Sequence, residues 1–172
     1  IELINHIARR VPAILTIKYF GFEGISPEKI MEWSRATQDD FFHNVTGDET
    51  KAKTAVKAGQ EMQSQLTKLV DNKFKNVASL AQKPREEQTI LDRMVMTIGD
   101  INDPSLSEDD LLDMVKDKVY ILKNDTEDLS KLDRATIISR VKSRVRTNLI
   151  GTLVGGLETT QAAISQVLNL IL

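Results

Sequence analysis

Hydrophobic residues recur at spacings of three and four along most of the chain, which places them on one face of an α-helix. The pattern predicts helices over about 1–21, 26–47, 50–77, 90–98, 107–122 and 133–172. No segment alternates hydrophobic and polar residues between turn signals, so we predict no β-strand. The chain is therefore expected to be all-α.

Local signals mark where several of these helices begin or bend. Ser26-Pro27-Glu28 is typical of an N-cap, a first-turn proline and an acidic residue that favours the helix dipole. Ser107, with Asp110 three residues later, approximates a capping box. Pro12 lies inside the first helical segment, where it should kink or restart the helix.

The two longest segments differ in how much of their surface is hydrophobic. Segment 50–77 has a narrow hydrophobic stripe, so most of its circumference should face water. Segment 133–172 would span roughly 60 Å at ~1.5 Å per residue. Its first half is basic and amphipathic, whereas from Leu149 onward it is apolar nearly all round. A helix that changes in this way is expected to enter the middle of a larger protein.

The composition excludes several kinds of function. The 172 residues are 41% hydrophobic and 28% charged, which suits one domain or part of a larger one. Lys and Arg number 23 against 25 Asp and Glu, and the net charge of −2 argues against a nucleic-acid-binding protein. The absence of cysteine excludes a disulfide, a thiolate nucleophile and a Cys-ligated metal or haem within these residues. Two histidines, His6 and His43, argue against a multi-His metal site, so no metal site is predicted.

The ends of the chain suggest that it belongs to something longer. It starts at Ile1 without a methionine, stops at Leu172 inside a hydrophobic run, and shows no signal-peptide pattern. We therefore expect an excerpt from a longer protein, and a cytoplasmic one.

One hexapeptide in the apolar half of the last segment carries chemistry. Gly155-Gly156-Leu157-Glu158-Thr159-Thr160 places a carboxylate and two hydroxyls in a stretch that is otherwise hydrophobic. Burying an unpaired carboxylate is costly, and threonine inside a helix can bond back to the carbonyl four residues earlier. Each glycine costs roughly 1 kcal/mol relative to alanine in a helix interior. In return, a flat ligand could lie directly against the backbone.

This hexapeptide resembles the Ala/Gly-Gly-x-Asp/Glu-Thr-Thr/Ser motif in the central I helix of the cytochrome P-450 superfamily, and every defined position agrees. Residues 8–22 resemble the E-helix phrase of bacterial members, and 107–111 the acidic lead-in to the I helix. The resemblance divides the chain into E- and F-like helices (1–47), a G-like helix (50–78), an H-like region with an insertion (85–128) and an I-like helix (133–172). About 25 residues, 114–139, stand where the family has almost none. In the family a Glu-x-x-Arg pair and the Cys loop that ligates haem lie downstream of the I helix, and neither follows the hexapeptide in this chain.

The resemblance implies a haem cofactor whose cysteine ligand lies outside these residues. The intact parent would oxygenate a small hydrophobic substrate with O2 and electrons from a donor protein, or with peroxide, while residues 1–172 alone would be inactive. Gly155 and Gly156 would face the haem and the oxygen cleft, with Thr160 beside them as a less certain participant. Thr159 would hydrogen-bond the bound dioxygen or its water, and Glu158 would relay protons. Phe41 and Phe42 could roof a substrate cavity.

A different class of function stays open. The chain could be a non-enzymatic helical interaction domain that packs its last helix against a partner, and an uncovered helix of this kind would also cause self-association. A membrane span over 149–172 is the third interpretation. It is disfavoured by the polar residues along it, which are Glu158, Gln161, Gln166 and Asn169.

Two further charged features have ordinary alternatives. Asp39-Asp40 with Asn124-Asp125 and Asp128 suggests a Mg²⁺ site, but neither acidic spacing is complete and such acids are usually solvated. The basic run 140–146 could dock an acidic redox partner or an anionic lipid, although such a run is more often a solvated helix face. His6 and His43 are expected to be ordinary surface or interhelix residues, and Trp33 a core residue.

Overall fold

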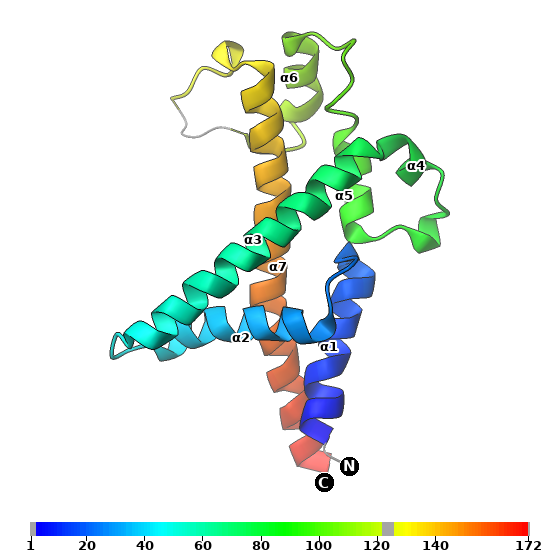
Figure 1. Ribbon diagram of the computed structural model, residues 1–172. Coiled ribbons are helices and arrows are strands. Elements are labelled where there is room, and N and C mark those ends of the chain that lie inside the picture. The colour runs from blue at the N-terminus through cyan, green and yellow to red at the C-terminus, as the bar shows by residue number, and fades with distance from the viewer. Residues whose placement is uncertain (1–2, 122–125, 172) are drawn as a thin grey trace. The chain divides into compact units, whose positions relative to one another are not determined.

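A computed structural model describes residues 3–121 and 126–171 of the chain, and every regular element in these ranges is a helix (Figure 1). This confirms the all-α prediction. The chain divides into two compact units. The first unit comprises residues 1–66 and 149–172, and the second comprises 67–148. The boundaries fall inside the two longest helices, α3 (Glu49–Lys75) and α7 (Arg134–Ile171).

The first unit opens with a continuous helical stretch whose winding changes twice. A π-helix, η1 (Ile4–Arg9), leads into α1 (Arg10–Thr16), and a second π-helix, η2 (Ile17–Gly21), follows. Pro12 therefore does not end the helix. Its ring would crowd the carbonyl four residues earlier, and wider π-turns on that side are a known way to relieve such crowding.

Helix α2 (Pro27–His43) begins where the sequence predicts and carries the core of the first unit. The Ser26 hydroxyl accepts a hydrogen bond from the Lys29 backbone N–H at 3.2 Å, which confirms the predicted N-cap. Trp33 is 1% exposed, as predicted, and its indole N–H donates to Glu61 of α3 at 3.3 Å. The buried hydrophobic side chains of this unit are Ala8, Ala13, Phe22, Ile30, Trp33, Ala55, Ala58, Met62, Leu66, Leu149, Leu153 and Leu157.

The second unit contains the end of α3 and the start of α7. Between them lie α4 (Val77–Ala81), the 3-10 turn η3 (Arg85–Glu87), α5 (Ile90–Ile98), α6 (Glu108–Lys116) and the turn η4 (Leu129–Lys131). Its buried hydrophobic side chains are Leu69, Val70, Phe74, Leu80, Leu91, Val95, Ile98, Ile101, Leu111, Val115, Val119, Ile121, Ile137, Val141 and Val145. The hydrophobic stripe of α3 continues to the end of the helix because its last part, with Leu69, Val70 and Phe74, packs in this second core.

The start of α6 was predicted correctly, and its end was not. The capping box between Ser107 and Asp110 is present. The helix stops at Lys116, however, rather than near 122. A turn follows, in which the backbone N–H groups of Lys118 and Val119 both donate to the carbonyl of Val115. Because this turn keeps Val119 buried four positions after Val115, the hydrophobic spacing predicts a longer helix than the chain forms.

A buried ion pair joins α3 to α5 inside the second unit. Lys73 and Asp92 are 4% and 0% exposed, and the Lys73 ammonium lies 2.7 Å from Asp92 Oδ1. The other oxygen of Asp92 accepts from the backbone N–H of Thr89 at 3.1 Å and from Lys83 at 3.3 Å. Burial by itself would raise the pKa of Asp92. The hydrogen bonds and charge of Lys73, together with the hydrogen bonds of Thr89, lower this pKa by more than burial raises it, so the pKa of Asp92 is below its ordinary value.

The basic half of α7 fastens the second unit together. Arg140 binds Glu127 through two hydrogen bonds of 2.8 and 2.6 Å and also donates to the Ile121 carbonyl. Lys142 pairs with Asp71 at 2.9 Å. The remaining members have partners too: Arg134 donates to the carbonyls of Leu106 and Asp103, Arg144 to that of Tyr120, and Arg146 to the Thr67 hydroxyl. These basic side chains therefore bind groups within the second unit and do not simply face water.

Candidate functional site

The hexapeptide 155–160 lies in the part of α7 that belongs to the first unit, and one buried row fixes its orientation. Leu149, Leu153, Leu157 and Gln161 follow one another at intervals of four residues and are all at most 6% exposed. Positions four apart stack on one side of a helix, so this row faces the core. Gly155, Gly156, Thr159 and Thr160 are all exposed. We call these four residues and the helix surface they share the open face.

Packing within the described residues gives no reason for two glycines on the open face. Both are ordinary helical residues, and a Cβ added to Gly155 or Gly156 would meet no atom within 4 Å. Alanine would fit at either position and would favour the helix by roughly 1 kcal/mol. The glycines leave backbone accessible to a group that approaches from outside these residues.

The two threonines turn their hydroxyl protons inward. Thr159 Oγ1 donates to the Gly155 carbonyl at 2.9 Å and to the Gly156 carbonyl at 3.2 Å, and Thr160 Oγ1 donates to the Gly156 carbonyl at 2.7 Å. Helix α7 nevertheless continues through the motif without a break. Since a hydroxyl oxygen also has lone pairs, both threonines can still accept a hydrogen bond on the open face.

Glu158 points to a different environment from its neighbour Thr159. Successive residues of a helix are about 100° apart around the axis. Glu158 is largely covered, with 21% of its side chain exposed, and its Oε1 lies 4.0 Å from Arg35 Nε of α2. That distance permits charge attraction without a direct hydrogen bond. Glu158 therefore faces α2, while Thr159 faces outward.

Beside Glu158 lies a polar groove of about 590 Å³. Its other walls come from the first helical stretch, α2 and α7, and they are mostly charged or polar: His6, Arg9, Arg10, Glu28, Glu32, Arg35 and Gln161, with Met31. Glu158 thus borders this groove, while the Thr159 hydroxyl, one residue further along the chain, lies on the open face.

A contact from α2 fixes the backbone just before the motif. The side-chain amide of Gln38 donates a hydrogen bond to the carbonyl of Val154. Neither Gln38 nor Arg35 stands out in the sequence, and both contact α7 more than a hundred positions further along the chain. No local pattern in the sequence encodes such a contact, so neither residue could be predicted from it.

The motif fits one wall of a haem site, but the chain supplies no ligand for its iron. The open face offers bare backbone and hydroxyl acceptors, which suits a flat group lying against α7. No cysteine occurs in the 172 residues. His6 lines the polar groove and His43 is exposed at the end of α2. Among residues 3–121 and 126–171, no three His, Cys, Asp or Glu side chains gather closely enough to hold a metal ion.

Two of the acids in the Mg²⁺ interpretation hold hydrogen bonds of their own. Asp40 accepts a hydrogen bond from Asn44 at 2.7 Å, and Asp128 accepts from the Ser130 backbone as a turn cap. Asn124-Asp125 lies outside the described residues. Phe41 and Phe42 are exposed and stack edge to face, with ring centres 4.8 Å apart.

The chain matches no protein-family model, no curated protein sequence and no solved structure. Over the part of the chain that the structure describes, no helix combines the length and the hydrophobicity needed to cross a membrane. What is shown is thus an all-α fold that ends in a 38-residue helix.

Proposed function

We propose that α7 forms one wall of a haem pocket in a cytochrome P-450-like oxygenase, and that these 172 residues are a helical part of that enzyme. The observation that carries the proposal is the division of the motif between two environments. Gly155, Gly156, Thr159 and Thr160 share the open face, whereas Glu158 borders the polar groove. Packing inside the unit does not require this arrangement, and an oxygenase would use each part of it.

The two glycines would let the haem lie close to the α7 backbone, with Thr160 at its edge. Thiolate-ligated haem iron supplies the binding and reductive activation of O2, with electrons from a donor protein, and its Cys ligand would come from residues outside this chain. A small hydrophobic substrate would lie against the same wall. The chain would contribute neither nucleic-acid binding nor a metal ligand. The proposed location is the cytoplasm.

Glu158 and Thr159 would together manage protons at the open face. Glu158 would relay protons from solvent in the polar groove, where its charged neighbour is Arg35, 4.0 Å away. A change of its side-chain rotamer would carry a proton toward the open face. Thr159 Oγ1, whose own proton is donated to Gly155, would accept a hydrogen bond there and hold a water or a protonated oxygen in place.

The proposal is tested in the intact parent enzyme with any hydrophobic substrate that it oxidises. Thr159→Ala should release peroxide and consume electrons without forming product, since the acceptor that positions the proton is lost. Thr147→Ala is the matched control, because Thr147 is exposed on the same helix and makes the same bond to a carbonyl four residues earlier, at 2.9 Å. Full coupling in Thr159→Ala would contradict the role given to this residue.

A second candidate function has its own observation. A row of exposed hydrophobic residues follows η1, α1 and η2, and consists of Ile4, Ile7, Val11, Leu15 and Tyr19. Such a row suits a helical interaction domain as well as an enzyme part covered by the rest of its fold. The two functions differ in one respect: only the oxygenase requires a haem-ligating cysteine in the same polypeptide.

A further inference from the structure

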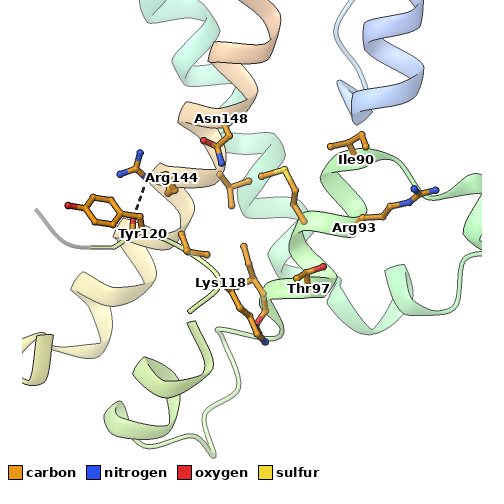
Figure 2. Close-up of a pocket in the computed structure, with 11 residues that line it drawn as sticks. Ile90, Arg93, Thr97, Lys118, Tyr120, Arg144 and Asn148 are labelled. Atoms are coloured by element: carbon orange, nitrogen blue, oxygen red, sulfur yellow. Dashed lines mark hydrogen bonds between the residues drawn. The ribbon is translucent and has the colours of Figure 1, made fainter. Parts of the chain in front are cut away.

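The second unit contains a groove of about 480 Å³ that the haem proposal does not use (Figure 2). It is lined by α5, by the segment 118–120 that follows α6, and by the basic half of α7. Its volume falls in the range of about 300–1,000 Å³ that is typical of small-molecule sites. The inference drawn from it is independent of whether the parent protein binds haem.

The floor of this groove is hydrophobic and anchored in the core. It is formed by Ile90, Met94, Ile98, Val119 and Val145. Of these, Ile98, Val119 and Val145 are at most 7% exposed, so their positions are fixed by packing on the other side. Ile90 and Met94 are half-buried and leave apolar surface toward the groove. A hydrocarbon group would gain by covering this floor.

Three cations line the groove, and none of its described lining residues is acidic. They are Arg93 of α5, Lys118 of the segment 118–120 and Arg144 of α7, and their charged ends point away from one another (Figure 2). Each is steadied by a backbone carbonyl: Arg93 by that of Arg85 at 3.0 Å, Lys118 by that of Ile98 at 3.3 Å, and Arg144 by that of Tyr120 at 3.2 Å. Carbonyl partners orient these side chains without cancelling their charge.

The neighbouring cations of α7 provide the contrast. Arg140 and Lys142 are neutralised by the carboxylates of Glu127 and Asp71. Arg144 instead lies over the ring of Tyr120, with its guanidinium carbon 5.1 Å from the ring centre. Its Nε–H is the donor used on the Tyr120 carbonyl, so the terminal N–H groups form a planar fork that suits a carboxylate. Within the described residues, the positive charge at this groove lacks a carboxylate partner.

We propose that this groove binds a small amphipathic anion, namely an unbranched aliphatic carboxylate. Its hydrocarbon chain would cover the floor formed by Met94 and Val119, and its carboxylate would bind the planar fork of terminal N–H groups of Arg144. Packing fixes the position of the floor, and backbone carbonyls orient the cations. It would bind the free molecule rather than a membrane or a peptide.

The first test compares three ligands that share one tail, namely decanoate, decanol and decylammonium, below their micelle-forming concentrations. Binding is followed through the methyl NMR signals of 13C-labelled methionine in the purified protein. Decanoate should shift the signal of Met94 saturably and leave that of Met62, buried in the first unit, unmoved. Decylammonium should have no effect on Met94. Equal shifts with all three ligands, or none with decanoate, would overturn the proposal.

The second test uses variants of the groove. Arg144→Gln should weaken decanoate binding about 10-fold, as expected for one charge-assisted hydrogen bond. Lys118→Gln and Arg93→Gln should weaken it less, because these charged ends point elsewhere, and both residues are exposed, so the variants should fold. Lys116→Gln removes the same charge two positions away, outside the groove, and should leave the affinity unchanged. Thr97→Phe fills the groove and should abolish binding. Affinities that fall equally in Lys116→Gln, or that survive Thr97→Phe, would show that no such site exists.

Discussion

Replacing Asp92 by asparagine should destabilise the protein strongly, because it leaves a buried cation without its carboxylate partner. The substitution keeps the size of the side chain and one acceptor oxygen, but it removes the charge that Lys73 contacts at 2.7 Å. The Lys73 ammonium would then stay buried, at 4% exposure, without its carboxylate. Loss of one partner from a buried ion pair costs about 3–5 kcal/mol. Lys83 adds little to this figure because a third of its side chain is already exposed to water.

The assay is urea unfolding of the purified protein, followed by circular dichroism at low protein concentration. Asp92→Asn should lose about 3–5 kcal/mol of the free energy of unfolding. The control is Asp113→Asn, which breaks the surface pair with Lys116 and should cost at most about 1 kcal/mol. The double variant Asp92→Asn with Lys73→Met should recover part of the loss, since it removes the stranded charge as well. An Asp92→Asn variant as stable as Asp113→Asn would refute the reasoning.

The same pair gives the protein a defined acid response. The pKa of Asp92 is below its ordinary value in the folded state, mainly because the Lys73 and Thr89 hydrogen bonds outweigh the effect of burial. A carboxyl group with a lowered folded pKa contributes stability that is fully present above its unfolded pKa and is lost as pH falls through the folded pKa. Wild-type stability should therefore decline from roughly pH 5 downward. In Asp92→Asn this part of the decline should be missing, and an unchanged slope would contradict the assignment.

Three further predictions concern the first unit. Gly156→Ala should raise the free energy of unfolding of this chain by up to about 1 kcal/mol in urea, because the helix gains and the added Cβ meets nothing within 4 Å, yet it should impair haem binding in the parent, measured by haem absorbance. Trp33→Ala should cost about 3–5 kcal/mol in the same unfolding assay, because the fully buried indole leaves a cavity. The chain by itself should self-associate through its exposed hydrophobic row, and Val11→Lys with Leu15→Lys should lower the mass measured by light scattering; a monomeric wild type would contradict this.

Local signals in the sequence were sufficient to predict where most helices begin. Ser26 and Ser107 cap the helices that follow them because capping depends on residues three positions apart. The hydrophobic spacing predicts too late an end for α6, since Val115 and Val119 keep helical spacing although the helix ends at Lys116 and only a turn follows. The π-turns on either side of α1 have no separate sequence signal, because their hydrophobic spacing is close to that of an α-helix.

The candidate site shows the same limit more sharply. The hexapeptide 155–160 was recognisable because its residues are adjacent, and the buried row through Leu157 follows from helical periodicity. The contacts that give the motif its two environments come from Arg35 and Gln38, which are separated from it by most of the chain. Thr67, the hydrogen-bond partner of Arg146, is 79 positions away in the sequence. The sequence around a basic run therefore does not show whether its side chains bond within the unit or face water.

The most direct test of the central claim is to determine the coding sequence that follows Leu172 in the source gene. The account predicts a Glu-x-x-Arg pair and then a Phe-x-x-Gly-x-x-x-Cys-like loop in the same reading frame, which would provide the thiolate ligand for a haem against the open face of α7. A stop codon directly after Leu172, or a continuation that encodes no cysteine, would contradict the oxygenase proposal and favour the helical interaction domain.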